Sequence, residues 1–216
     1  MIASVALKPK PIPSEQQYIV LQGVSWATYQ NLVREIIHEQ RARITYDQGQ
    51  LEIMVPLPEH ESYKRLFGRM IETTTEELGL EIRSFGSCTW GRADLQRGIE
   101  ADESYYIQQE KSVRGRINLD LSTDPAPDLV IEIDITSSSL NRMGIYARLG
   151  VGEVWRFDGS QLRFYILQEG SYTEVEVSQV LPLLQRADVL AMIQKAQETG
   201  ETTWIKAVRE WIRTLI

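Results

Sequence analysis

Two acidic side chains interrupt an otherwise hydrophobic segment, "PDLVIEIDITSSS", at residues 127–139. Side chains alternate along a β-strand, so Glu132 and Asp134 share one face with Asp128, whereas Leu129 and the isoleucines share the other. At about 3.3 Å per residue, Glu132 and Asp134 are roughly 6.6 Å apart, and Asp128 is about 13 Å from Glu132. Glu132 and Asp134 are therefore close enough to share one small site, and Asp128 is not.

The chemistry of such a pair depends on what compensates its charge. This strand follows Pro127 and leads into a helix, and such a crossover usually lies inside a sheet with both faces covered. Two carboxylates on a partly covered face resist ionisation unless a cation or a basic side chain compensates them. Oxygen ligands suit Mg²⁺ or Mn²⁺, which polarise phosphoryl oxygens and activate bound water. The alternative is that these carboxylates only form the wet face of a half-exposed sheet.

A third carboxylate is expected from a neighbouring strand. Asp102, in "EADESYYIQ", is the best placed, whereas Glu103 has the opposite parity. We therefore expect Asp102, Glu132 and Asp134 to bind one Mg²⁺ or Mn²⁺ ion, the arrangement that phosphodiester hydrolysis needs.

The N-terminal half indicates helices alternating with strands. A helix is expected over about 26–40, with Ser25 as its N-cap. The segment "ARITYDQGQLEIMV" alternates as a β-hairpin does, and Gly49 suits its turn. A second helical pattern runs to Gly79, and β-rich segments continue to about residue 108.

The C-terminal half begins with the charged strand. A short helix is expected after it, with possible N-caps in Thr136–Ser139 and with Gly150 at its end. The segments "GEVWRF", "QLRFYIL" and "YTEVEV" then read as a meander of three strands, with turns at Gly159 and Gly170. The fold class is therefore α/β of the mixed α+β kind, with a central mixed β-sheet flanked by helices.

Two helices are expected at the C-terminus, at about 186–198 and 202–215. The second carries an apolar stripe that includes Trp204 and Trp211. Most such stripes pack into a core, and a homodimer contact through these two tryptophans is the alternative.

The domain organisation follows from these patterns. Residues 1–17, with three prolines, predict a flexible arm, 18–180 one domain, and 181–216 a helical extension of that domain.

Composition limits the classes of partner. The chain has 216 residues, 43% of them hydrophobic, and its single cysteine, Cys88, excludes an internal disulfide. No apolar run is long enough to cross a bilayer, and no secretory signal is visible, so a cytoplasmic location is expected. The net charge of −7 argues against tight, sequence-independent binding to a polyanion, so contacts with DNA must be local.

The sequence resembles the PD-(D/E)XK nuclease superfamily and, more narrowly, the bacterial Uma-type family of restriction-endonuclease-like domains. The resemblance is carried by "PDLVIEI", the serine-rich turn and "YARLGVGEVWRFD" at 146–158, and it runs from about Ser25 to Tyr172. It implies a restriction-endonuclease-like fold and a Mg²⁺-dependent DNA endonuclease that hydrolyses phosphodiester bonds. The alternative is a catalytically degenerate member that acts as a nucleic-acid or protein binding module.

The sequence departs from this family pattern at three positions. Ala101 precedes Asp102 where the family has proline, and Asp134 stands where the superfamily has lysine. In the family this lysine lies on the following helix, at the position of Arg142 here. Arginine can neutralise a phosphate but cannot serve as a general base, so water activation would fall to the metal. The alternative is that Arg142 is a surface residue without a catalytic role.

The resemblance also implies a site residue on the upstream helix, where Glu59, His60 and Glu61 are candidates. Helical spacing places Glu59 and His60 toward the buried side and Glu61 away from it. We select His60, which can orient a carboxylate or bind phosphate, against the alternative of a cap or a packed side chain. The serines at 137–139 have no nearby histidine as a base, so no serine nucleophile is expected.

Overall fold

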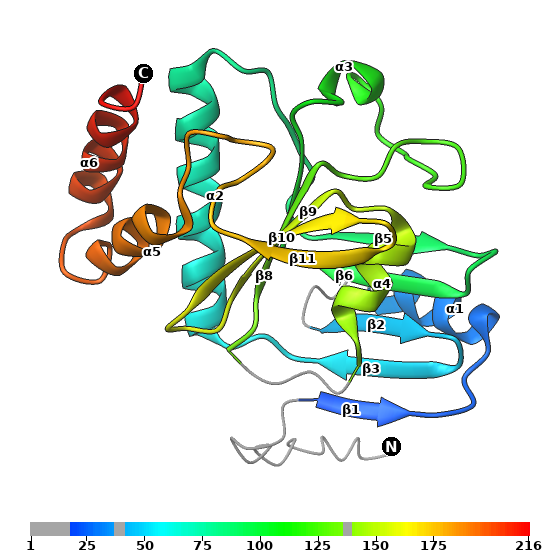
Figure 1. Ribbon diagram of the computed structural model, residues 1–216. Helices are drawn as coiled ribbons and strands as arrows, with labels where there is room; N and C mark the ends of the chain where they lie inside the picture. Colours follow the sequence, from blue (N-terminus) through cyan, green and yellow to red (C-terminus); the bar gives the residue numbers. More distant parts are fainter. Residues whose placement is uncertain (1–17, 37–41, 136–139) are drawn as a thin grey trace, which may run out of the picture.

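The computed structural model describes residues 18–36, 42–135 and 140–216, whose strands form two sheets (Figure 1). The strands are β1 (Tyr18–Leu21), β2 (Arg43–Asp47), β3 (Gln50–Met54), β4 (Arg83–Ser84), β5 (Cys88–Arg92), β6 (Arg97–Ala101), β7 (Glu103–Tyr106), β8 (Leu129–Ile133), β9 (Glu153–Phe157), β10 (Leu162–Gln168) and β11 (Ser171–Val175). The helices are α1 (Trp26–Ile36), α2 (Pro58–Leu78), α3 (Glu110–Val113), α4 (Arg142–Leu149), α5 (Arg186–Lys195) and α6 (Glu201–Arg213). The expected mixture of helices and strands is confirmed.

The charged strand, β8, lies inside a six-stranded mixed sheet. The strand order is β11-β10-β9-β8-β7-β4, in which β8 and β9 are parallel and the other neighbours antiparallel. Helix α4 belongs to the crossover between β8 and β9. The predicted meander is β9-β10-β11, and its turns contain Gly159 and Gly170 with φ of 93° and 81°, values that glycine adopts without steric cost.

The N-terminal hairpin belongs to a second, antiparallel sheet of order β1-β3-β2-β6-β5, where the sequence indicates a single central sheet. Strand β6 of the second sheet ends at Ala101 and strand β7 of the six-stranded sheet begins at Glu103, so a single residue connects the two sheets. Asp102 therefore lies at the junction of the two sheets.

The two faces of the six-stranded sheet pack in different hydrophobic cores. Leu129, Ile131 and Ile133 pack with residues of α2, α5 and α6. Val130 packs on the opposite side with residues of α4, β5 and β6. Successive side chains of β8 therefore point to opposite faces of the sheet, as predicted, and both faces are covered by other elements.

The apolar stripe of α6 is part of the core. Trp204 is fully buried, and its indole N–H donates to the Met192 carbonyl (2.6 Å). Helix α6 lies along α2 (Figure 1), and Trp211 packs partly buried against the same core. A homodimer contact could therefore use Trp211 but not Trp204, and dimerisation itself stays a prediction.

The helix ends agree in part with the sequence. Ser25 caps α1, since the Thr28 N–H donates to its hydroxyl (3.1 Å). The N-cap of α4 is Asn141, which accepts from the Gly144 N–H (2.9 Å), rather than a residue of the serine-rich run. That run at 136–139, the predicted arm at 1–17 and the expected helix end at 37–40 lie outside the described residues. Among the described segments, every helix is too short or too polar to span a bilayer.

Candidate active site

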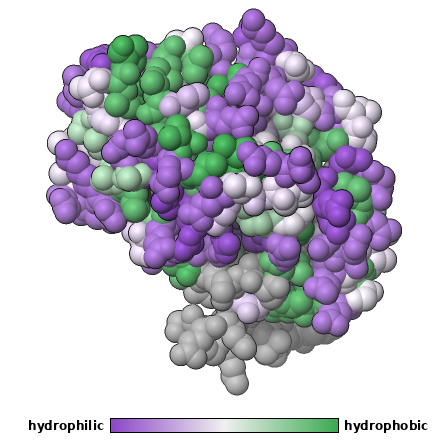
Figure 2. All heavy atoms as spheres, in the orientation of Figure 1, coloured by the Kyte–Doolittle hydropathy of each residue, from purple (hydrophilic) through white to green (hydrophobic). Residues whose placement is uncertain are grey.

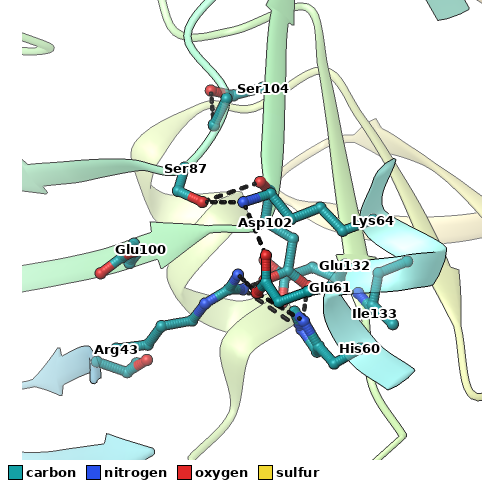
Figure 3. Close-up of polar contacts among 12 residues, drawn as sticks. Arg43, His60, Glu61, Lys64, Ser87, Glu100, Asp102, Ser104, Glu132 and Ile133 are labelled. Carbon is teal, nitrogen blue, oxygen red and sulfur yellow. Dashed lines mark hydrogen bonds and ion pairs between the residues drawn. The ribbon is translucent and has the colours of Figure 1, made fainter. Parts of the chain in front are cut away.

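Asp102 is the buried centre of a cluster at the junction of the sheets (Figure 3). The Ile133 backbone N–H donates to Asp102 Oδ2 (2.6 Å), and His60 Nε2 lies 3.0 Å from the same oxygen. Arg43 forms an ion pair with Asp102 Oδ1. The expected proximity of Asp102 to the charged strand is therefore present, through the backbone of the residue that follows Glu132.

Glu132 is held by two side chains of α4. Its Oε2 accepts from Arg142 Nε (2.8 Å) and lies 2.6 Å from Arg142 Nη2, while its Oε1 accepts from the Tyr146 hydroxyl. Glu132 is 5% exposed, so a charged carboxylate there needs these partners. Burial raises the pKa of Tyr146 well above its usual value, and the charge of Glu132 adds to this.

The remaining donors of Arg142 connect the two sheets. Nη1 donates to the Thr45 hydroxyl on β2 (2.9 Å), and Nη2 donates to the Glu100 carbonyl on β6 (3.0 Å). Burial is the largest influence and lowers the pKa of Arg142, but the charge and hydrogen bond of Glu132 together with the charges of Tyr146 and Glu52 outweigh it, so the net shift is upward. Each nitrogen of this guanidinium therefore has a protein acceptor, and the predicted contact with phosphate would require it to leave one of them.

Asp134 has a partner of its own. Arg156 on β9 contacts the Asp134 carboxylate with Nε (2.8 Å) and Nη2. Among the described residues, no group of three or more His, Cys, Asp or Glu side chains is placed to hold a metal ion. The structure therefore places Asp102 next to the strand that carries Glu132, whereas Asp134 forms an ion pair with Arg156.

The first turn of α2 contributes His60 and Glu61 in a way that differs from the helical-wheel expectation. His60 is buried against Asp102 as expected, whereas Glu59 is exposed. Glu59 is the second residue of α2, and contacts with Asp102 and Arg43, not the apolar stripe of the helix, bring His60 and Glu61 to the site. Glu61, expected to point away, accepts from Arg43 Nη2 (3.0 Å).

The electrostatics of Glu61 reflect these neighbours. A hydrogen bond with His60 lowers the pKa of the Glu61 carboxyl to about 2. Burial opposes this shift, and the positive charges of Lys64 and Arg43 add to it. Lys64 also donates to the Ser87 hydroxyl (2.6 Å), so α2 and the chain before β5 meet beside the cluster (Figure 3).

A cavity of about 820 Å³ opens next to this cluster. Arg43 and Glu61 lie in its wall, together with residues of α1 and β5. The rings of Trp26 and Tyr29 form another part of the wall, with centroids 4.9 Å apart. Trp26 Nε1 and the Tyr29 hydroxyl are buried without a hydrogen-bond partner within the described chain. The cavity wall therefore combines aromatic rings with cationic side chains, whereas these two polar atoms are themselves buried.

Arg43 is the site residue that sequence reasoning missed. It starts the hairpin strand β2 with the parity of Thr45, on what reads as the polar face of a two-stranded ribbon. Both side chains are buried, at 4% and 2% exposure. An arginine on an expected wet face carries no sequence signal of burial; that face is interior only because Asp102, His60 of α2 and Arg142 of α4 lie against it.

A divalent ion does not fit the carboxylates as they are arranged. Asp102 Oδ2 and both oxygens of Glu132 accept hydrogen bonds from the protein, and Asp102 Oδ1 lies in an ion pair with Arg43, so two of the partners are arginines. A metal ion requires free lone pairs at such oxygens and is repelled by an adjacent guanidinium.

Comparisons with known proteins place the chain in a family. A solved structure described as a putative nuclease belonging to DUF820, from Anabaena variabilis ATCC 29413, matches with 17% identity and a TM-score of 0.49, over 69% of this chain and 90% of that chain. A comparison with curated proteins finds no match. The model of the Uma2 family, described as "Putative restriction endonuclease", matches residues 26–197. The chain therefore belongs to the Uma2 family of putative restriction endonucleases.

Proposed function

We propose that this protein binds nucleic acid, with DNA as the first candidate, in the cavity beside Asp102, and that it does so without hydrolysis at this site. The observation that carries the proposal is the cavity itself. Its volume of about 820 Å³ lies in the range of ligand sites, and its wall combines aromatic rings with cationic side chains. Bases stack on aromatic side chains, and cations hold the backbone phosphates.

The cations at the cavity support a local phosphate contact. Arg34 and Lys64 line it, and Arg34 is exposed on the last turn of α1. Trp26 is half-buried, so its ring supplies a surface for one base. A net charge of −7 makes a local patch the only favourable place for a polyanion.

The expected lack of hydrolysis rests on which side chains of the cluster could accept a proton from water. A hydrolase needs a group that activates water. Both ring nitrogens of His60 have carboxylate neighbours, Nε2 at 3.0 Å from Asp102 and Nδ1 at 3.3 Å from Glu61. Arg43 and Arg142 cannot act as bases because arginine stays protonated. Within the described chain, the side chains in contact with Asp102 and Glu132 are therefore two arginines, which cannot act as bases, and a histidine and a tyrosine that these carboxylates already hold.

A Mg²⁺- or Mn²⁺-dependent DNA endonuclease is the second candidate. Two observations favour it: membership of the Uma2 family and the hydrogen bond that joins Asp102 to the strand of Glu132. This function would require Arg43 and Arg142 to leave the two carboxylates.

Binding and cleavage assays separate the two functions. Labelled single-stranded DNA, double-stranded DNA and RNA are titrated by fluorescence anisotropy. We expect binding that weakens several-fold in Trp26→Leu and Lys64→Gln but not in Lys206→Gln, an exposed lysine on α6. The absence of binding to all three probes would refute the proposal.

The same probes are incubated with Mg²⁺ or Mn²⁺ and analysed on gels. We expect no cleavage. Cleavage that is lost in Glu132→Gln would establish the endonuclease instead.

A further inference from the structure

Two buried carboxylates meet at the junction of the sheets and must be neutralised there. Asp102 is 1% and Glu132 is 5% exposed. A buried charge without a partner is strongly destabilising, so the fold needs a compensating cation at this position. Metal-dependent nucleases supply that charge with a divalent ion, which also needs two carboxylates and open coordination sites.

In this chain the compensating charge comes from the protein itself. Arg142 enters from α4 and contacts Glu132 with Nε and Nη2, at 2.8 and 2.6 Å. Arg43 enters from β2 and pairs with the Asp102 carboxylate (Figure 3). Two guanidinium groups carry the charge of one divalent ion, and they balance the two carboxylates.

The further contacts of both arginines fix them in place. Arg142 donates to the Thr45 hydroxyl and the Glu100 carbonyl, so it also joins the sheets. Arg43 donates to Glu61 (3.0 Å) and is 4% exposed. Arginine keeps its charge at every physiological pH and is less strongly hydrated than an ammonium group, which suits it to a permanent buried role.

We propose that Arg43 and Arg142 permanently occupy the place of a divalent ion between Asp102 and Glu132, so that this site excludes Mg²⁺ and Mn²⁺. The proposal concerns the ion content of the site. It stands independently of whether the cavity binds nucleic acid.

The test is Mn²⁺ binding, followed by the electron paramagnetic resonance signal of free Mn²⁺ and by thermal unfolding. Wild-type protein should neither bind Mn²⁺ at this site nor gain thermal stability from it. The double variant Arg43→Gln/Arg142→Lys removes one cation and shortens the other, and leaves carboxylate oxygens without donors. It should bind one Mn²⁺ per chain at least about tenfold more tightly than wild type, with a rise in Tm on addition of the ion.

The matched control is Arg116→Gln/Arg163→Lys, which makes the same two types of change at partly exposed arginines that pair with Asp124 and Asp158. It should behave as wild type. A folded Arg43→Gln/Arg142→Lys protein that binds no more Mn²⁺ than this control overturns the proposal.

A second arm uses wild-type protein and Glu132→Gln, because the double variant could fail to fold. Stoichiometric Mn²⁺ binding by wild type that is lost in Glu132→Gln overturns the proposal. Equal, weak binding by both supports it. A double variant that folds only when Mn²⁺ is present also supports it, since the ion then replaces the missing guanidinium charge.

Discussion

At the scale of single residues, Glu132 illustrates what a charge inside a sheet requires. Both faces of β8 are covered, so the carboxylate cannot be solvated, and its oxygens are taken by Tyr146 and Arg142. A hydrogen bond to a charged acceptor is stronger than one to a neutral acceptor, and its loss leaves part of a buried charge unpaired. Tyr146 therefore stabilises the fold through the site as well as through packing.

We expect Tyr146→Phe to lower the free energy of unfolding by about 1–3 kcal/mol, because Glu132 Oε1 loses its donor without loss of packing volume. Urea denaturation measures the change. The control is Tyr172→Phe, which removes a hydrogen bond to the neutral Val151 carbonyl (2.8 Å) at a half-buried position and should cost less. Equal costs would show that the charge of Glu132 does not strengthen the bond.

The depressed pKa of Glu61 predicts a loss of stability in acid. Its pKa is about 2 in the folded chain against an ordinary 4.5, so the unfolded state binds more protons between these values. The free energy of unfolding should therefore fall as the pH is lowered from 4.5 to about 2, and it should fall less in Glu61→Gln. Urea denaturation at several pH values measures this, with Glu59→Gln, at an exposed position, as the control. Identical pH profiles for wild type and Glu61→Gln would contradict the assignment.

At the scale of elements, the packing of α1 against the second sheet depends on a glycine, Gly98, at the point of contact. Tyr29, on α1, ends against Gly98 of β6, where a Cβ would lie 2.6 Å from the ring carbon Cζ. Tyr29 also stacks on Tyr46 of β2, with centroids 4.9 Å apart. The helix can therefore approach the sheet, and enclose the cavity, only because position 98 is glycine.

Gly98→Ala should destabilise the protein by about 1–3 kcal/mol, because the added methyl group overpacks this contact. Gly200→Ala is the control, since a Cβ there meets no atom within 4 Å. Thermal unfolding measures both changes. In Tyr29→Leu the cost of Gly98→Ala should shrink, as expected for two residues in contact. If Gly98→Ala costs as much in the Tyr29→Leu background as in wild type, the strain does not arise from the contact with Tyr29.

At the scale of the whole molecule, two sheets joined at Asp102 create an interior that neither sheet has alone. Arg43 of one sheet pairs with Asp102 at the junction, and Thr45 of the same sheet accepts from Arg142, which also holds Glu132 of the other sheet. The outer surface is different: the face in Figure 2 is mostly hydrophilic, in keeping with the net charge of −7. The cations that line the cavity, Arg34, Arg43 and Lys64, lie there beside Glu61 and Glu100, so any attraction for an anionic partner is confined to a few side chains.

This distribution of charge predicts a weak salt dependence of DNA binding. With Arg34 and Lys64 as the phosphate contacts, the slope of log K against log salt for double-stranded DNA should be about −2, at roughly −0.9 per phosphate neutralised. Anisotropy titrations between low and physiological salt measure it. A slope of about −5 or steeper would indicate a broad basic face and would contradict binding at the cavity.

The sequence by itself determined the elements and the family. Hydrophobic periodicity, capping residues and turn glycines are local signals, and they predict the hairpin, α2, the charged strand, the meander and the C-terminal helices at nearly their observed positions. The motif at 127–158 was enough to indicate the Uma family, which the match over 26–197 confirms.

Only the tertiary structure decided what neutralises the acids. The sequence predicts that Glu132 needs a cation, and it leads us to expect a divalent metal ion there, whereas the structure places Arg142 beside Glu132 and Arg43 beside Asp102. Arg43 lies 89 residues before Glu132 in the chain, and it becomes a partner of the site only because two sheets meet at Asp102. Charge compensation acts over a few ångströms in space, and periodicity along the chain carries no information about such long-range proximity.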